Sequence, residues 1–412
     1  MVGRIAGCCG VLALPVWLAL APVVWANAAT DAATAAAEAE AEKAAPAATP
    51  AATVGTWHVR EVDGVEYVPL EDLRSFYKLM PLQPKGRKVA GQRVLGNGEV
   101  ELLFGPAPRE LFIQNRLCVL THPVHQDVSG DLLVSRTDVL NVIEPVLRPT
   151  YIANRQAVRT VVLDPGHGGH DTGTVTAYAR EADVALVVAA KLGAELRKRG
   201  YEVIFTQEQN QYQSPQARVD KANAAPAAIF LSLHLNSGRS DMKGVQAYTL
   251  APPAKNEKTL PGHEFSQSSM ALAMALQSAM VEKAGAEDGG CRRAHYSPLN
   301  SLRCPAVMLE LGYATNPEEG SRLSSEEYQL KVVNALAEGV DAYARVMNPA
   351  TVLQVQKAPV VETPPAPVKV EPASPAKAQA APQKAKPRKN AARRRAPARK
   401  PARPANRRNR RR

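Results

Sequence analysis

Between residues 157 and 348, short apolar runs alternate with longer segments in which apolar residues recur at helical spacing. A short continuous apolar run bounded by turn residues predicts a buried strand, whereas recurrence every three or four residues predicts an amphipathic helix. On this basis strands are predicted at 159–164, 201–206, 227–233, 244–250 and 305–311, and helices at 183–200, 215–225, 268–285 and from Ser324 onward. This alternation predicts an α/β sandwich with a largely parallel sheet.

Two of these helices carry end signals. Basic residues fill the last turn of the 183–200 helix, and Gly200 is a typical stop residue. Ser324, followed three residues later by Glu327, is typical of a capping box. The last helix is therefore expected to begin at Ser324 and to end before Asn348.

Residues 55–150 show a less regular pattern and are predicted to form a small α+β module. A short strand ends at Pro69, and one helical face then carries Leu70, Leu73, Phe76 and Tyr77. Residues 110–120 alternate like a strand, and residues 132–147 repeat the order of strand and helix.

The segment Gly64–Leu73, which reads Gly-x-x-Tyr-Val-Pro-Leu-x-Asp-Leu, resembles the copper-amine-oxidase N-terminal-like domain of exported bacterial envelope proteins. The resemblance implies an accessory module and, despite the family name, no copper site. His122 and His125 form a His-Pro-Val-His segment without acidic or cysteine neighbours, which favours a surface loop over a metal site.

Residues 1–28 are typical of a cleaved secretory signal peptide. They combine Arg4, an apolar run from Val11 to Trp25 and the small-x-small triplet Ala26-Asn27-Ala28. A membrane anchor is the alternative, but spanning needs about 20 uninterrupted apolar residues, and two prolines interrupt this run. Export with cleavage is therefore predicted.

The chain has 412 residues, of which 45% are hydrophobic, so it can bury a large core and is not wholly disordered. Residues 29–54 are predicted to form a low-complexity leader, and residues 349–412 a disordered tail rich in Pro, Ala, Lys and Arg. The net charge is +12, yet residues 384–412 alone hold 15 basic residues and no acid. The rest of the chain is therefore slightly acidic, which does not favour a basic nucleic-acid-binding fold.

Three of the five cysteines, Cys118, Cys291 and Cys304, would remain after cleavage. Three cysteines are too few for a disulfide scaffold. Cys291 and Cys304 could close a short loop in an oxidising compartment, but free buried thiols are favoured.

Polar residues follow or interrupt three of the predicted strands. The first group is the segment Asp164–Gly169, the second is His234 with Asn236, and the third is Glu310 within an apolar run. Open α/β sheets place ligands beyond the carboxyl ends of their strands. Each group also has a structural explanation on its own: a tight turn, a hydrogen-bonded core histidine and a buried salt bridge.

Taken together, five segments occur in an order that resembles the zinc-dependent N-acetylmuramoyl-L-alanine amidases (type 3 amidase family). They are VVLDPGHGGHDTG, READVAL, IFLSLHLN, GVQAYTL and PAVMLELGYATNPEE, and the resemblance covers residues 158–346. It implies Zn²⁺ ligands at His167, Glu181 and His234, a catalytic carboxylate at Glu310, and a mixed sheet of about six strands with helices on both faces.

The chemistry of these residues agrees with the resemblance. Catalytic zinc often takes two His and one Glu and leaves a fourth position for water, whose pKa it lowers towards about 7. A carboxylate that is not a ligand must then move the proton, and the apolar surroundings of Glu310 suit that role. Asp164 is expected either to orient His167 or to cap its turn, and Arg218 either to bind a substrate carboxylate or to pair with a buried acid.

The remaining polar residues near these segments receive structural interpretations. Asn236 and Asn316 are expected to cap loops, and His295 is expected at the surface. His170 and His263 receive no role. Only a short loop follows Leu250, where some family members carry a long helical insertion over the zinc, so an open groove is expected, with coverage by the N-terminal module as the alternative.

The implied reaction is hydrolysis of the amide bond between N-acetylmuramic acid and the L-alanine of peptidoglycan. We expect an exported monomer in the periplasm or cell envelope, with the basic tail held to anionic envelope polymers or lipids. A tail that only keeps the protein soluble is the alternative. A cell-wall-binding pseudoenzyme is disfavoured because all four site residues are present. A polybasic nucleic-acid-binding protein is disfavoured because no recognition fold accompanies the tail, and no specific nucleic acid is expected.

Overall fold

The computed structural model describes residues 57–82, 92–105, 107–153, 155–225, 228–253 and 257–348. The predicted signal peptide, leader and basic tail lie outside these residues. Among the described residues, none of the helices combines the length and apolar character required to span a bilayer.

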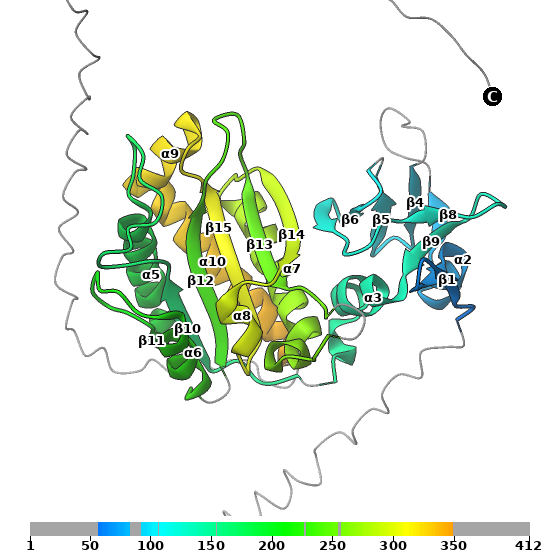
Figure 1. The fold of residues 1–412 in the computed structure, drawn as a ribbon, viewed down its shortest axis with the longest axis horizontal. Coiled ribbons are helices and arrows are strands. Elements are labelled where there is room, and N and C mark those ends of the chain that lie inside the picture. Colours follow the sequence, from blue (N-terminus) through cyan, green and yellow to red (C-terminus); the bar gives the residue numbers. More distant parts are fainter. Residues whose placement is uncertain are drawn as a thin grey trace, which may run out of the picture. The chain divides into compact units, whose positions relative to one another are not determined.

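Six strands from residues 157–348 form the part of the sheet that carries the sequence segments described above (Figure 1). They are β10 (Thr160–Pro165), β11 (Glu202–Phe205), β12 (Ala228–Asn236), β13 (Val245–Leu250), β14 (Asp288–Ala294) and β15 (Ala306–Tyr313). Their spatial order is β11-β10-β12-β15-β13-β14. Only the β13–β15 pair among these six is antiparallel, so the prediction of a mixed, largely parallel sheet is confirmed.

Helices cover both faces of this sheet, as predicted (Figure 1). One layer contains α5 (Glu181–Lys198), α7 (Ser266–Lys283) and α10 (Glu326–Met347), and the other contains α6 (Pro215–Asn223) and α8 (Ser297–Ser301). Successive side chains of a strand point to opposite faces. In β10, Val161 and Leu163 therefore join the core under the first layer, whereas Val162 joins the core under the second.

The beginning of the last helix differs from the prediction. A separate helix α9 (Pro317–Ser324) ends at Ser324, and α10 begins at Glu326. Ser325 is the N-cap, and its side chain accepts the backbone N–H of Tyr328. The proposed capping box of Ser324 and Glu327 is therefore wrong by one residue, because the serine one position later has the extended backbone that a cap requires.

The number of strands also differs from the prediction. Six strands come from residues 157–348, but the sheet continues from β14 into the N-terminal module and contains eleven strands. The added strands are β7 (Arg116–Val119), β6 (Glu110–Ile113), β5 (Glu101–Phe104), β4 (Arg93–Gly96) and β3 (Met80–Leu82). An unpaired β14 would leave an exposed sheet edge, and pairing with β7 covers it.

The rest of the N-terminal module is a second, four-stranded sheet with short helices. Its strands are β1 (Arg60–Val62), β2 (Val65–Pro69), β9 (Leu132–Ser135) and β8 (His125–Gln126). Its helical segments are α2 (Leu70–Phe76), α3 (Arg136–Asp138), the π-helix η1 (Val139–Ile143), α4 (Glu144–Leu147) and the 3₁₀ turn η2 (Pro149–Tyr151). The predicted change from strand to helix at Pro69 is therefore confirmed.

The two histidines of this module do not form a simple surface loop. His125 lies in β8, and its ring packs edge-on against the buried Tyr67 with ring centroids 4.9 Å apart. His122 Nδ1 lies 3.7 Å from the carboxylate of the buried Asp138. Within the described ranges, neither histidine belongs to a cluster of three potential metal ligands.

Candidate metal centre

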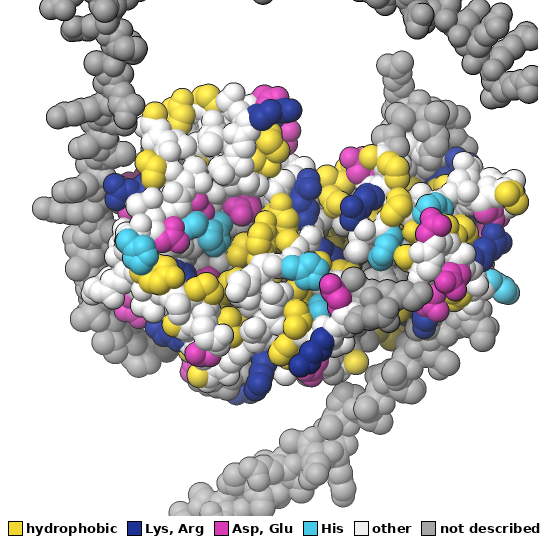
Figure 2. All heavy atoms as spheres, in the orientation of Figure 1, with side chains coloured by type: hydrophobic (Ala, Val, Ile, Leu, Met, Phe, Trp, Pro, Cys, Tyr) yellow, Lys and Arg dark blue, Asp and Glu magenta, His cyan; other side chains and the backbone are white. Residues whose placement is uncertain are grey.

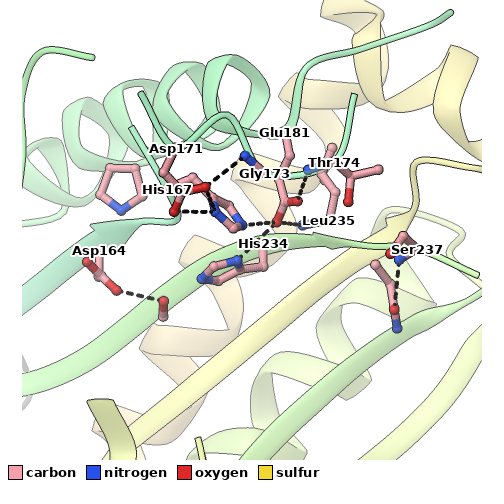
Figure 3. Close-up of polar contacts among 12 residues, drawn as sticks. Asp164, His167, Asp171, Gly173, Thr174, Glu181, His234, Leu235 and Ser237 are labelled. Atoms are coloured by element: carbon pink, nitrogen blue, oxygen red, sulfur yellow. Dashed lines mark hydrogen bonds and ion pairs between the residues drawn. The ribbon is translucent and has the colours of Figure 1, made fainter. Parts of the chain in front are cut away.

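Three potential metal ligands converge at the carboxyl ends of two neighbouring strands. His167 follows β10 by two residues, His234 lies near the end of β12, and Glu181 is the first residue of α5. One ligand atom from each residue lies within 4.8 Å of the others. Figure 3 shows the three side chains pointing toward one another. The three residues selected from the sequence therefore lie together in the structure.

Glycines permit this close approach. His167 has φ = +62°, and it is followed by Gly168 and Gly169, which also have positive φ. A Cβ at Gly166 would lie 2.6 Å from His234 Nδ1, and a Cβ at Gly173 would lie 2.6 Å from Glu181 Oε2. Real Cβ atoms do not come so close to other atoms, so glycine is required at both positions.

Glu181 is the buried anion of the cluster, with 4% of its side chain exposed. Its Oε1 lies 3.0 Å from both His167 Nε2 and His234 Nδ1 and accepts the backbone N–H of Leu235. Its Oε2 accepts the backbone N–H of Thr174. Burial alone would raise the pKa of this carboxyl, but the bonds to the two histidines and the backbone outweigh it and hold the pKa below its usual range.

Asp171 orients His167 from the other side of the ring. His167 Nδ1 lies 2.9 Å from Asp171 Oδ1 and 3.0 Å from Oδ2 (Figure 3). The hydrogen bond with Glu181, followed by the contact with Asp171, raises the pKa of His167 to about 9. A cation bound at this position would displace the proton that these two carboxylates favour.

Asp164 does not orient His167, so that alternative of the sequence analysis is wrong. Its carboxylate accepts hydrogen bonds from Thr206 Oγ1 and Ser232 Oγ and pairs with Arg218 Nη1 at 2.7 Å. Arg218 also donates to the backbone carbonyls of Pro165 and His167. The prediction that Arg218 pairs with a buried acid is confirmed, and the pair anchors the turn that carries His167.

Glu310 lies beside the cluster in the middle of β15. It is the register partner of His234 in the parallel pair β12–β15 and of Gln246 in the antiparallel pair β13–β15. Its Oε2 is buried and has no hydrogen-bond partner among the described residues. Burial, reinforced by the charge of Glu181 and opposed by His234, raises the pKa of Glu310 to about 7. A carboxyl with this pKa exchanges a proton readily near neutral pH.

Aromatic and amide side chains surround Glu310. The rings of Tyr248 and Tyr296 lie edge to face with centroids 5.3 Å apart, and Tyr248 donates to Gln246 Oε1. Burial, together with the charge of Tyr296 and against that of Arg292, raises the pKa of Tyr248 to about 12. Figure 2 shows a band of hydrophobic side chains over β15 and β13, beside exposed histidine and acidic side chains.

Four of these residues were not selected from the sequence: Asp171, Gln246, Tyr248 and Tyr296. For Asp171 a signal existed, because an acid four residues after His167 can return to the ring when a glycine-rich turn separates them. Gln246 and Tyr296 carry no signal of their own, since their positions beside Glu310 depend on which strands pair.

Asn236, Asn316 and His295 lie as the sequence suggested, whereas His170 and His263, which received no role, make local contacts. Asn316 caps α9 by accepting two backbone N–H groups, and Asn236 accepts the N–H of Ser237. His295 is exposed. His170 packs against Tyr212 with ring centroids 4.3 Å apart, and His263 Nδ1 accepts the N–H of Leu260.

Comparison with known proteins places the cluster within one matched region. A family model described as N-acetylmuramoyl-L-alanine amidase matches residues 161–342. The uncharacterized protein YqiI of Bacillus subtilis (strain 168) is 30% identical over 185 residues, which cover 45% of this chain and 84% of that protein. The N-acetylmuramoyl-L-alanine amidase LytC of the same strain is 27% identical over 186 residues, covering 45% of this chain but only 36% of LytC.

A solved structure is also similar. It is the catalytic domain of CwlV, an N-acetylmuramoyl-L-alanine amidase from Bacillus (Paenibacillus) polymyxa var. colistinus. The sequence identity is 28%, the TM-score is 0.41, and the match covers 46% of this chain and 99% of that one.

Proposed function

Because the chain belongs to the N-acetylmuramoyl-L-alanine amidase family, we propose that it hydrolyses the amide bond between N-acetylmuramic acid and L-alanine in peptidoglycan. The observation that carries this proposal is the convergence of His167, Glu181 and His234 at the strand ends, with Glu310 beside them. All four residues lie inside the matched region.

We propose that His167, Glu181 and His234 hold one Zn²⁺. Two imidazole nitrogens and one carboxylate oxygen are a common donor set for catalytic zinc, which keeps a further position open. The buried, anionic Glu181 and the glycines at 166 and 173 favour a small cation between the two rings. When bound, zinc supplies a water of lowered pKa and polarises the scissile carbonyl.

In this proposal Glu310 is the general acid and base. Its Oε2 accepts the proton of the attacking water and returns it to the nitrogen of the departing L-alanine. The raised pKa of about 7 means that the deprotonated and protonated forms are both accessible near neutral pH. The lack of a hydrogen-bond partner at Oε2 in the described residues leaves that atom available for a water or substrate.

Asp171 is proposed to position His167. Its carboxylate contacts Nδ1, which leaves Nε2 directed at Glu181 and the proposed metal. Such outer carboxylates select the ring tautomer and increase the basicity of the ligating nitrogen. Asp171 therefore acts through His167 and does not touch the substrate in this account.

The proposed substrate indicates the cellular location. Peptidoglycan lies outside the cytoplasmic membrane, so we propose an exported protein of the periplasm or cell envelope, as the signal-peptide pattern predicts. The 15 basic residues from Lys384 to Arg412 are proposed to hold the protein near anionic envelope polymers or lipids. We propose that the protein acts as a monomer.

Product analysis on purified sacculi tests the proposed reaction. The full-length protein should release stem peptides that begin with a free L-alanine amino group and leave glycan strands with intact N-acetylmuramic acid. Glu310→Gln serves as the inactive control, and a metal chelator should stop release. A protein that sediments with sacculi but releases no such peptides, with zinc present, would instead support a cell-wall-binding pseudoenzyme.

A further inference from the structure

Two buried cysteines face each other where the N-terminal module joins the rest of the sheet. Cys118 lies in β7 and Cys291 lies in β14, and they are register partners in the parallel pairing of these strands. Both are free thiols, with relative exposures of 0% and 1%. Neither has a role in the proposed hydrolysis.

The contacts around the two cysteines hold this register. On one side of the pair, the backbone N–H of Leu117 donates to Asp288 Oδ2 at 2.9 Å. On the other side, Arg293 Nη1 donates to Thr121 Oγ1 at 2.9 Å. Residues within three positions of each cysteine are therefore tied across the junction both before and after the pair.

The geometry suits a disulfide. Neighbouring strands lie about 4.8 Å apart, and disulfides join Cα atoms about 4.4–6.8 Å apart. The neighbouring thiol of Cys118, together with burial, raises the pKa of Cys291. Cys304 belongs to the core on the opposite face of the sheet. The structure therefore does not bring Cys291 and Cys304 together, and it does not support the disulfide between them that the sequence left open.

We propose that Cys118 and Cys291 form a disulfide that links the N-terminal module covalently to the catalytic region. One thiolate attacks a disulfide donor, such as oxidised glutathione or a protein disulfide, and releases one donor thiol. The second thiolate then displaces the other donor thiol. The two cysteines lose two protons and two electrons in total, and the donor is reduced to two thiols.

The pairing between β7 and β14 is short, so a covalent bond there would stabilise the junction. Only one residue pair is in register between β7 and β14, whereas β10 and β12 share six. The bond would close the chain between residues 118 and 291, a segment that contains the three proposed zinc ligands. Because both sulfurs are buried, the bond forms while the junction is still open during folding and is then shielded from reductants.

Peptide mapping tests this proposal without depending on amidase activity. The full-length protein is refolded with oxidised and reduced glutathione, blocked with an alkylating agent in denaturant so that buried thiols also react, and digested with trypsin without reduction. We expect peptide 117–136, which contains Cys118, to be joined to peptide 284–292, which contains Cys291. Peptide 304–322, which contains Cys304, should be alkylated.

Two variants provide the controls. Cys304→Ser should retain the linked peptide, whereas Cys118→Ser should lose it. Oxidation should raise the thermal midpoint of Cys304→Ser but not that of Cys118→Ser, and the two should unfold at similar temperatures when reduced. After oxidative refolding and alkylation in denaturant, alkylation of both Cys118 and Cys291, or a link from either one to Cys304, would overturn the proposal.

Discussion

Glu310 illustrates how the surroundings of one residue determine its chemistry. A carboxyl on an exposed strand would be ionised at neutral pH, but burial in β15 and the nearby charge of Glu181 raise the pKa of Glu310 to about 7. His234, its register partner, opposes that change. The same site therefore holds one carboxylate that stays charged, Glu181 at the start of α5, and another that can carry a proton, Glu310 in β15.

The first prediction concerns this proton transfer. Glu310→Gln should lower turnover on sacculi by about 10²–10⁴-fold, because the amide cannot accept the proton of the attacking water. Zinc content and thermal midpoint should stay close to those of the unaltered protein. Glu318→Gln, which changes an exposed carboxyl at the start of α9, is the matched control and should keep full activity. Loss of zinc from Glu310→Gln would instead make Glu310 a ligand.

The second prediction tests whether Asp171, which is not a proposed zinc ligand, supports zinc binding by orienting His167. Asp171→Asn should weaken zinc binding by about 10–100-fold, because the amide no longer fixes the His167 ring as a charged acceptor does. Competition with a fluorescent zinc chelator measures this change. Asp171→Glu should recover part of the affinity. Equal affinity in the unaltered protein and Asp171→Asn would show that the contact with His167 does not support the metal.

At the scale of elements, the buried pair of Asp164 and Arg218 joins β10 to α6 and holds the turn after the strand. Arg218 bonds two carbonyls of that turn, so the strand end, the helix and the backbone of His167 form one polar unit. Buried charged groups of this kind depend on each other, because removal of one leaves the other unpaired away from water.

The third prediction follows from that dependence. Asp164→Ala should lower the free energy of unfolding by about 3–5 kcal/mol, since it leaves the guanidinium of Arg218 buried without its anion. Urea unfolding measures the change. The control is Asp241→Ala, which removes an exposed partner of Arg239 and should cost under about 1 kcal/mol. Equal effects in the two variants would contradict a structural role for Asp164.

The helix α3 and strand β14 meet through a second buried pair. Asp138 is fully buried, and Arg293 Nη1 lies 3.7 Å from its Oδ1. Burial alone would raise the pKa of Asp138, but bonds to His122, Ser135 and Thr121 and the charge of Arg293 lower it from 3.8 to about 2. A lowered carboxyl pKa stabilises the fold above the unfolded value of 3.8, and this stabilisation is lost as the pH falls toward 2.

The fourth prediction uses this pH dependence. At neutral pH, Asp138→Asn should lower the free energy of unfolding by roughly 2 kcal/mol, the size expected for such a pKa change. As the pH falls below 3.8, the difference from the unaltered protein should shrink. Chemical unfolding at neutral pH and at about pH 3 measures both values. A difference that stays constant over this range would mean that the charge of Asp138 contributes nothing.

The sequence predicts a strand well where a short, continuous apolar run is compatible only with a buried strand. The β10 run is buried at every position, and the strand ends at the residues from which the metal site was expected. β14 was missed because Gly289 and Gly290 interrupt it and basic residues follow, so no apolar alternation is present. For Asp171 the glycine-rich turn is a signal in the sequence, but the contact with His167 also depends on the positive φ of His167.

At the scale of the whole molecule, the least predictable feature is the continuation of the sheet into the N-terminal module. Pairing of β14 with β7 joins residues 173 positions apart at Cys118 and Cys291, and short sequence patterns do not specify such distant partners. All of the described residues nevertheless fall in a single compact unit. The proposed metal site therefore belongs to a sheet that the module extends, while the matched family region covers only residues 161–342.

The zinc content of the full-length protein tests the central claim most directly. Elemental analysis after removal of loosely bound metal should give about one zinc per chain, as expected for a single three-ligand catalytic site. The His167→Ala, His234→Ala double variant should contain almost none while keeping its helical and strand content by circular dichroism. Zinc content unchanged in the folded double variant would contradict the assignment of His167, Glu181 and His234 as the metal site.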